Sequence, residues 1–509
     1  MKRAGNFLLS LSGWMLLATV AAGPWMMGSL PPRAIAAIET MLAAASVSWL
    51  LGLMLQRRWP AINGLVVLGM ILVGLGWAVT LHPIATYASD ARQFIGNGAS
   101  GAGTLDGFTS RLTMESVTAL FGAFWMGSDL FKSARLRRRF LWTLSISGAS
   151  VAVLGILQHA GVSTFLLDWM SPHEGQPFGP FNYHGNAGAF LLMGLAAGLG
   201  LAAAAFAGGR RRAAMLAGLA VLVTLAGICM STSRTAVVLA LVMMPALASA
   251  AWRMFAPALA RPAQHARKIG WGITGGLLLA AGMAFFCMPG KWRLLLEQLS
   301  GEHGRYVVWR IGAGMAKDAG WFGLGPATFG LMLPLTPRFE PELFRLAIVT
   351  YQVPGDRVSM WVHAHNDLLQ AFVEWGWIGG MLWTVAAAMA VRKGIQAVWR
   401  RGAPAMERVE LAGAFAGLSV VMLQSLVDFP FGVLALQLPA VLCAACLAAG
   451  VRTGGPMETL AVERMETRVR IRGAGAHHPA TLVRKIPHPA DNPSASAPNR
   501  ENPRQKRDR

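Results

Sequence analysis

The sequence predicts an all-α polytopic membrane protein with about 12 transmembrane helices. Hydrophobic residues make up 54% of the 509 residues, and charged residues make up only 14%. Long apolar runs recur along the chain, with short clusters of Lys and Arg between them. A soluble protein of this length needs more charged surface than this, so we expect lipid to surround most of the chain.

The expected transmembrane helices are apolar stretches of about 18–22 residues, the length that crosses roughly 30 Å of hydrocarbon. The first stretch follows Lys2 and Arg3 and is too long for the core of a signal peptide, so we expect it to be retained. Only residues 231–234 separate two of the stretches, which favours a helical hairpin there. The stretches cover residues 6–27, 35–55, 61–81, 113–131, 140–160, 185–207, 214–230, 235–252, 269–289, 375–391, 409–428 and 432–451.

The distribution of Lys and Arg predicts the orientation in the membrane. The net charge of +21 is concentrated in short loops and in the C-terminal tail, which is typical of membrane orientation signals rather than of a nucleic-acid surface. Placing the N-terminus in the cytoplasm brings these clusters, and the C-terminus, to the cytoplasmic face. The opposite face then receives the polar segments 82–112, 161–184, 231–234 and 290–374.

The expected organisation has four parts. Residues 1–289 form the first nine transmembrane helices, 290–374 a large loop on the non-cytoplasmic side, 375–451 three further helices, and 452–509 a basic, disordered cytoplasmic tail. The large loop has equal numbers of acidic and basic residues and many Trp, Phe and Leu, so we expect it to be partly helical and to fold back onto the membrane helices. The tail either contacts anionic lipid or is a solvated extension.

Three short motifs follow one another in the large loop. The glycine-rich motif lacks the Gly-Lys-Ser/Thr sequence of a phosphate-binding loop, so we expect a tight turn there. In chain order the motifs are Gly304-Arg305-Tyr306-Val307-Val308-Trp309, then Gly323-Leu324-Gly325-Pro326-Ala327-Thr328-Phe329, then His365-Asn366-Asp367-Leu368-Leu369-Gln370 followed by Glu374-Trp375-Gly376.

Further motifs border the other polar segments. They are Phe178-Gly179-Pro180-Phe181-Asn182-Tyr183-His184-Gly185-Asn186, Ser231-Thr232-Ser233-Arg234 and Leu426-Val427-Asp428-Phe429-Pro430. Over residues 150–440, the order of all these motifs resembles the O-antigen ligase and O-antigen polymerase superfamily. The N-terminal helices agree with that family only in their apolar character, and the tail matches nothing recognisable.

The resemblance implies a multi-pass glycosyltransferase of the bacterial inner membrane, with a type C-like architecture and a periplasmic large loop. Its donor would be a glycan linked to undecaprenyl pyrophosphate, and its acceptor a lipid A core sugar. A polymerase that extends a growing glycan and a protein O-oligosaccharyltransferase share this donor and stay open. The non-enzymatic alternative is a transporter of lipid-linked glycan, but the polar motifs gather on one face and no inverted repeat is visible.

The implied transfer is inverting and needs neither a metal nor another cofactor. His363 and His365 have a spacing that two metal ligands can have, but no third ligand is suggested by the sequence. All four cysteines lie in or beside apolar stretches, so we expect no disulfide framework and no zinc site.

Two arginines and one histidine are the candidate catalytic residues. A diphosphate leaving group needs fixed cations, and the planar guanidinium of Arg234 or Arg305 can bind phosphate oxygens through two parallel hydrogen bonds. The acceptor hydroxyl needs a base, for which His365 has suitable chemistry. The alternatives are a snorkelling side chain for Arg234 and an ordinary loop salt bridge for Arg305.

Five further residues are candidates for substrate binding. Arg310 follows Arg305 on the same expected helix but faces another direction. Asn366, Gln370 and Glu374 are suited to holding sugar hydroxyls or the histidine ring, although helix capping and packing are equally open. Asn186 lies in the outer turn before a transmembrane helix. Asp428, in a late apolar segment, is expected either to pair with an arginine or to contact substrate.

Overall fold

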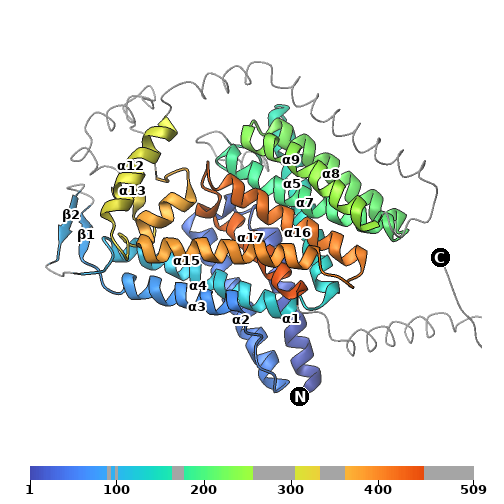
Figure 1. Ribbon diagram of the computed structural model, residues 1–509, viewed down its shortest axis with the longest axis horizontal. Helices are drawn as coiled ribbons and strands as arrows, with labels where there is room; N and C mark the ends of the chain where they lie inside the picture. The colour runs from blue at the N-terminus through green and yellow to red at the C-terminus, as the bar shows by residue number, and fades with distance from the viewer. Residues whose placement is uncertain (89–92, 98–100, 163–176, 256–303, 333–361, 452–509) are drawn as a thin grey trace, which may run out of the picture. The chain divides into compact units, whose positions relative to one another are not determined.

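The computed structural model describes residues 1–88, 93–97, 101–162, 177–255, 304–332 and 362–451. All of them belong to one compact unit, Met1–Thr453 (Figure 1). The expected span at 269–289 and the basic tail at 452–509 lie outside the described residues, as do parts of the polar segments 82–112, 161–184 and 290–374.

The described chain is helical, as the sequence predicts. Every expected apolar stretch that falls within the described ranges coincides with a helix, and the expected hairpin at 231–234 joins α8 to α9. The helices are α1 (Lys2–Ala22), α2 (Pro32–Leu55), α3 (Gly64–Thr80), α4 (Gly107–Leu130), α5 (Ala134–His159), α7 (His184–Ala207), α8 (Arg211–Met230), α9 (Arg234–Phe255), α12 (Gly304–Asp318), α13 (Phe329–Met332), α15 (Asp367–Val398), α16 (Ala405–Gln424) and α17 (Leu434–Gly450), with 3-10 turns η1 (Met27–Ser29) and η4 (Pro430–Gly432).

Six of the described helices are long and apolar enough to cross a membrane, namely α1, α2, α5, α7, α8 and α9. The apolar helices α3 and α17 are shorter. Leu216, Leu219 and Leu222 lie on one side of α8 and are each at least 60% exposed, which suits contact with lipid rather than with water. The described helices therefore support an all-α membrane protein, and the total of about 12 crossings stays a prediction.

Helix α7 lies in the interior of the bundle, packed against α5, α8, α9 and α16 (Figure 1). Glycines allow the close approach. A Cβ added at Gly194 would lie 3.1 Å from the Cα of Gly148 in α5, and one added at Gly200 would lie 3.0 Å from the Cα of Gly413 in α16. Small residues at crossings are the usual means by which membrane helices gain van der Waals contact, because lipid supplies no hydrophobic drive between helices.

Two ion pairs join the first turns of α5 to the first turns of α16. Arg137 is 3% exposed, and its Nη2 lies 2.5 Å from Glu407 Oε1. The next residue, Arg138, reaches Glu410 Oε1 at 2.7 Å. These contacts tie the start of α5 to α16, because a buried charge needs a partner.

A small hairpin is the described exception to the helical fold. Strands β1 (Ala85–Ala88) and β2 (Gln93–Gly96) pair antiparallel, with Ala85 opposite Gly96. The hairpin belongs to the expected polar segment 82–112.

The described parts of the large loop form their own apolar cluster. Val308 and Ile311 of α12 pack with Phe329 of α13 and with Val373 of α15. The cluster joins α12 and α13 to the first turns of α15, which Figure 1 shows together at one end of the bundle.

This cluster is connected to the apolar part of α15 at a glycine crossing, the place where the segment 320–325 runs against Gly376. Gly376 interrupts α15 with φ 66° and ψ −171°, and the segment 320–325 runs against the interruption. The N–H groups of Leu324 and Gly325 donate to Val373 O and Glu374 O before the kink, at 3.1 and 3.0 Å. A Cβ added at Gly376 would lie 2.3 Å from the backbone N of Gly323, so only glycine fits the crossing.

Candidate active site

The centre of the site is a histidine and aspartate pair. His365 Nδ1 lies 3.2 Å from Asp428 Oδ1. The Asp428 side chain is 3% exposed and the His365 side chain is 17% exposed, so the carboxylate is enclosed while the ring reaches the surface. A carboxylate can only accept, so Nδ1 carries the proton in this contact and Nε2 is the basic nitrogen of the neutral ring. Among the described residues, the partner of Asp428 is therefore His365 rather than an arginine, and contact of Asp428 with substrate stays a prediction.

The backbone of His365 is in the left-handed region, with φ 51°. This conformation is uncommon for a residue with a side chain and costs on the order of 1–3 kcal/mol. The carbonyl of His365 accepts a hydrogen bond from Trp309 Nε1 at 3.2 Å, which ties the strained residue to α12. Strain held in this way is typical of a functional position.

Aromatic rings enclose the pair. Phe429 is stacked between His363, at 4.4 Å between ring centroids, and Tyr183, at 5.4 Å. The His365 ring meets the edge of this stack, at 4.7 Å from Phe429 and 6.3 Å from Tyr183. Burial, and then the proximity of His365, lower the pKa of His363 to about 4, so His363 is neutral at physiological pH. His363 therefore supports the stack and is unsuited to carrying a proton there.

Arg305 reaches the same cluster from α12. Its Nη1 donates to Val427 O at 3.0 Å, and its Nη2 donates to Tyr183 Oη at 2.9 Å. Val427 directly precedes Asp428 in the chain. A guanidinium carries five N–H donors, so these two bonds fix the plane of Arg305 and leave further donors for an anion.

The start of α7 lines the other side of the pair. A Cβ added at Gly185 would lie 2.5 Å from Asp428 Oδ2, so glycine is needed for the carboxylate to approach the helix. Asn186 is 2% exposed, and its Oδ1 has no hydrogen-bond partner among the described residues. Just before this helix, Phe181 packs against Gly28 of η1, so the outer turn is anchored to the N-terminal helices.

Arg234 begins α9, and the structure places it near the same end of α7. A Cβ added at Gly188 would lie 2.8 Å from Oγ of Ser233, the residue before Arg234. Thr232 has φ 61°, which closes the tight turn between α8 and α9. Contacts to Tyr183 and Val427 link Arg305 to the His365 cluster, and the expected joint action of Arg234 with Arg305 stays a prediction.

The other candidate residues have structural contacts in the described chain. Asn366 caps α15 by accepting from Leu369 N at 2.9 Å. Gln370 Oε1 accepts from Ala364 N at 3.2 Å, and its Nε2 donates to Glu374 Oε1 at 2.8 Å. These contacts fix the turn that contains His365 against the start of α15. They support the alternatives of helix capping for Asn366 and of packing for Gln370.

Glu374 lies at the glycine crossing, and Arg310 lies on the exposed surface of α12. Glu374 is 7% exposed, and burial raises its pKa to about 7 despite hydrogen bonds from the backbone N–H groups of Ala327 and Phe329. Arg310 is exposed on α12. Substrate binding by either residue stays a prediction.

Three site features were not identified from the sequence. Tyr183 and Phe429 lie in motifs that the sequence analysis quoted, but their stacking joins parts of the chain that only the fold brings together. Asp367 lies two residues after the candidate base, and its Oδ2 accepts from Phe431 N at 2.9 Å, which fixes η4 beside the site. Burial raises the pKa of Asp367 well above its usual value.

The arrangement can accept a proton and bind an anion side by side. His365 offers a base oriented by Asp428. Arg305 offers a fixed cation on the hydroxyl of Tyr183, whose ring contacts His365. Within the residues that the structure describes, no group of three His, Cys, Asp or Glu side chains could hold a metal ion.

Comparison with known families supports the resemblance that the motifs predict. Residues 197–384 match the family model described as O-antigen ligase. The matched range contains Arg234, Arg305 and His365, whereas Tyr183 and Asp428 lie outside it. No curated protein matches the chain.

Proposed function

We propose, from the O-antigen ligase match at residues 197–384, that this multi-pass membrane protein transfers a glycan from undecaprenyl pyrophosphate to a hydroxyl acceptor, the preferred acceptor being a lipid A core sugar. The observation that carries the proposal is the His365–Asp428 pair beside Arg305. A base and a fixed cation are the two groups that displacement of a diphosphate by a hydroxyl requires.

In the proposed reaction, the acceptor oxygen attacks the anomeric carbon of the donor glycan. The new carbon–oxygen bond forms as the bond from that carbon to the diphosphate oxygen breaks, and the diphosphate leaves with the electron pair. His365 Nε2 takes the proton from the acceptor hydroxyl, while Asp428 holds the ring and stabilises the imidazolium that forms. Arg305, together with Arg234, stabilises the charge on the departing diphosphate.

The proposed displacement is inverting and independent of metal ions. A single attack from the side opposite the diphosphate inverts the anomeric carbon, so the product linkage has the opposite configuration from the donor. Because a guanidinium supplies the cationic charge, chelation of divalent cations is expected to leave the rate of the purified protein unchanged.

Deletion of the gene, followed by complementation, tests the function. Under the proposal, the deletion strain accumulates long glycan on the lipid carrier and lacks glycan on lipid A, and wild-type protein restores the transfer. His365→Ala is expected to lower transfer by about 10²–10⁴-fold, the contribution of a general base. His159→Ala, an exposed histidine at the end of α5, is the matched control and should retain full transfer.

Other outcomes of the same experiment identify the alternatives. Transfer of single repeat units in the deletion strain indicates a polymerase, and loss of glycan from proteins alone indicates a protein O-oligosaccharyltransferase. A precursor trapped on the cytoplasmic side indicates a transporter. Normal lipid A glycan in a His365→Ala strain with normal protein levels would contradict the catalytic assignment.

A further inference from the structure

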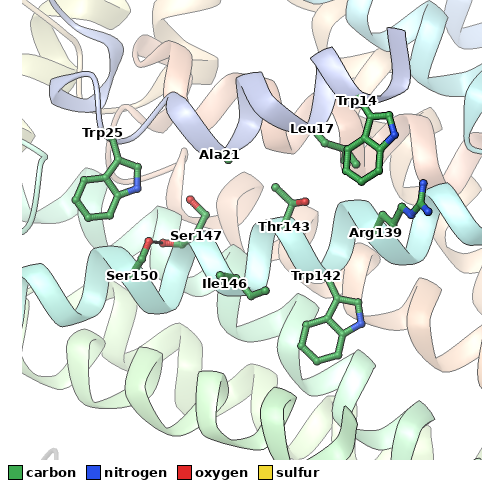
Figure 2. Close-up of a pocket in the computed structure, with 10 residues that line it drawn as sticks. All are labelled: Trp14, Leu17, Ala21, Trp25, Arg139, Trp142, Thr143, Ile146, Ser147 and Ser150. Atoms are coloured by element: carbon green, nitrogen blue, oxygen red, sulfur yellow. Dashed lines mark hydrogen bonds between the residues drawn. The ribbon is translucent and has the colours of Figure 1, made fainter. Parts of the chain in front are cut away.

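A groove between α1 and α5 lies apart from the candidate active site. Its cavity volume is about 540 Å³, within the range of about 300–1,000 Å³ that is usual for ligand pockets. Figure 2 shows α1 and α5 side by side, with Trp14 next to Arg139 at one end of the groove and Trp25 at the other. Leu17, Ala21 and other apolar side chains line most of the length between them.

Arg139, at the charged end of the groove, differs from the two arginines directly before it. Arg137 and Arg138 pair with Glu407 and Glu410, whereas no carboxylate among the described residues pairs with Arg139. The Arg139 guanidinium instead lies 4.7 Å from the centroid of the Trp14 ring. A cation–π contact orients a guanidinium without neutralising it, so Arg139 offers an anion-binding group at the groove's end.

A buried hydroxyl faces the same groove two turns farther along α5. Ser147 lines the groove and is 5% exposed, and its Oγ has no hydrogen-bond partner among the described residues. A buried hydroxyl without a partner is costly in an apolar environment. Thr143, between Arg139 and Ser147, places a second hydroxyl on the groove. A ligand with an anionic head and oxygen acceptors next to it would satisfy all three residues.

We infer that this groove binds one anionic glycerophospholipid, with its phosphate on Arg139, its ester oxygens near Thr143 and Ser147, and an acyl chain along Leu17 and Ala21 toward Trp25. Each part of the lipid meets a group of matching chemistry. Arg139 belongs to the basic cluster that the charge distribution places on the cytoplasmic side, so the lipid comes from that leaflet.

The position along α5 distinguishes this lipid from a polyprenyl diphosphate donor. Phe178, in the turn that leads to Tyr183, packs against Gly155, so the active-site end of α5 is the end at Gly155. Arg139 lies sixteen residues before Gly155, about 24 Å along a helix axis. A diphosphate held at Arg139 could not also reach Arg305, so the groove and the active site bind different phosphates.

Native mass spectrometry of the purified full chain tests the inference. The protein is extracted from nanodiscs made of phosphatidylethanolamine and phosphatidylglycerol in equal amounts, and the lipids retained per chain are counted. Wild-type protein is expected to retain one phosphatidylglycerol in preference to phosphatidylethanolamine. Arg139→Gln is expected to lower that retention about fivefold, because one cation near the lipid head is removed.

Two further variants separate the groove from general charge. Arg135→Gln removes an exposed arginine one turn earlier on α5 and should leave retention unchanged. Ala21→Phe fills the apolar part of the groove and should lower retention while Arg139 is intact. Equal loss in Arg135→Gln and Arg139→Gln, equal retention of the two lipids, or displacement of phosphatidylglycerol by an equimolar amount of undecaprenyl phosphate would each overturn the inference. None of these results depends on glycan transfer.

Discussion

At the scale of single residues, the site depends on how Asp428 orients His365. The carboxylate is buried against Gly185 and contacts Nδ1 of the ring. An exposed histidine without such a partner would sample several ring orientations and both neutral tautomers. Under the proposed function, the contact with Asp428 gives the candidate base His365 a defined ring orientation.

Asp428→Asn tests this orientation. The amide keeps the size of the side chain but can donate to Nδ1, which favours the tautomer with the proton on Nε2. We expect glycan transfer to fall about 100-fold, with little change in the apparent affinity for donor, because the base is lost rather than the binding surface. Steady-state kinetics of the purified protein would measure both quantities.

A structural role alone predicts a different result for the same residue. If Asp428 only stabilises the fold, Asp428→Asn would lower the thermal midpoint and transfer would recover at low temperature. Asp106→Asn, which changes a carboxylate that caps α4, serves as the matched control for loss of a buried or capping acid. Unchanged transfer in Asp428→Asn would contradict the assignment of Asp428 as the positioning residue.

At the scale of elements, the glycine crossing determines where the loop ends and the membrane helix begins. Beyond the kink, Trp377 N donates to Gly320 O and Ile378 N donates to Trp321 O. The segment 320–325 is therefore hydrogen-bonded to both halves of α15. The first half carries the helix cap and Gln370, and the second half continues into the apolar part of the helix. The direction of the first half, and with it His365, follows from Gly376.

Gly376→Ala is expected to weaken both the fold and the site. The added Cβ would lie 2.5 Å from the carbonyl of Trp321, at a φ that side chains rarely adopt. Overpacking of this kind costs about 1–3 kcal/mol, so the thermal midpoint and glycan transfer should both fall. Gly314→Ala, at an open position on α12, is the control and should keep both at wild-type levels. Wild-type stability of Gly376→Ala would show that the crossing is loosely packed.

At the scale of the whole molecule, a buried carboxyl group at the crossing links stability to pH. Burial raises the pKa of Glu374 from 4.5 to about 7, so the folded state prefers the protonated form more strongly than the unfolded state does. The stabilisation is complete below about pH 4.5 and is lost as pH rises through about 7, because ionisation is then favoured on unfolding. The whole change is on the order of 3 kcal/mol.

Thermal unfolding in detergent between pH 5 and pH 8 checks this linkage. The wild-type midpoint is expected to fall as pH rises, and Glu374→Gln is expected to flatten the decline because the amide does not titrate. Glu115→Gln, which changes an exposed carboxylate on α4, should leave the wild-type slope intact. A slope that survives in Glu374→Gln would assign the pH dependence to another group.

The sequence predicts the helices of this fold far better than it predicts their junctions. Apolar runs of membrane length are local signals, so α8 and α9 could be separated across four polar residues. The kink at Gly376 could not be foreseen, because it depends on a backbone segment that crosses from elsewhere in the loop. Likewise, Arg305 and Tyr183 are 122 residues apart and meet only through the fold.

The candidate base and one cation were identified from motifs, and their partners were not. His365 and Arg305 belong to short motifs that resemble those of the O-antigen ligase and polymerase superfamily. The link from Asp428 to His365 spans 63 residues and gives no local signal, since an aspartate in an apolar segment suits an arginine partner as well as a histidine. Where a functional group lies is therefore more easily predicted than what orients it.

The contact between Phe181 and Gly28 limits how far the active site can be treated as a module. The family match begins at residue 197, after the turn that supplies Tyr183 and Gly185. That turn is anchored on η1, between the first two helices of the chain. A chimera that carries only residues 197–384 into a related scaffold would transfer the candidate base and arginines without Tyr183, which contacts His365 and Arg305. Exchange of acceptor specificity between such proteins should therefore require the N-terminal helices to move with the loop.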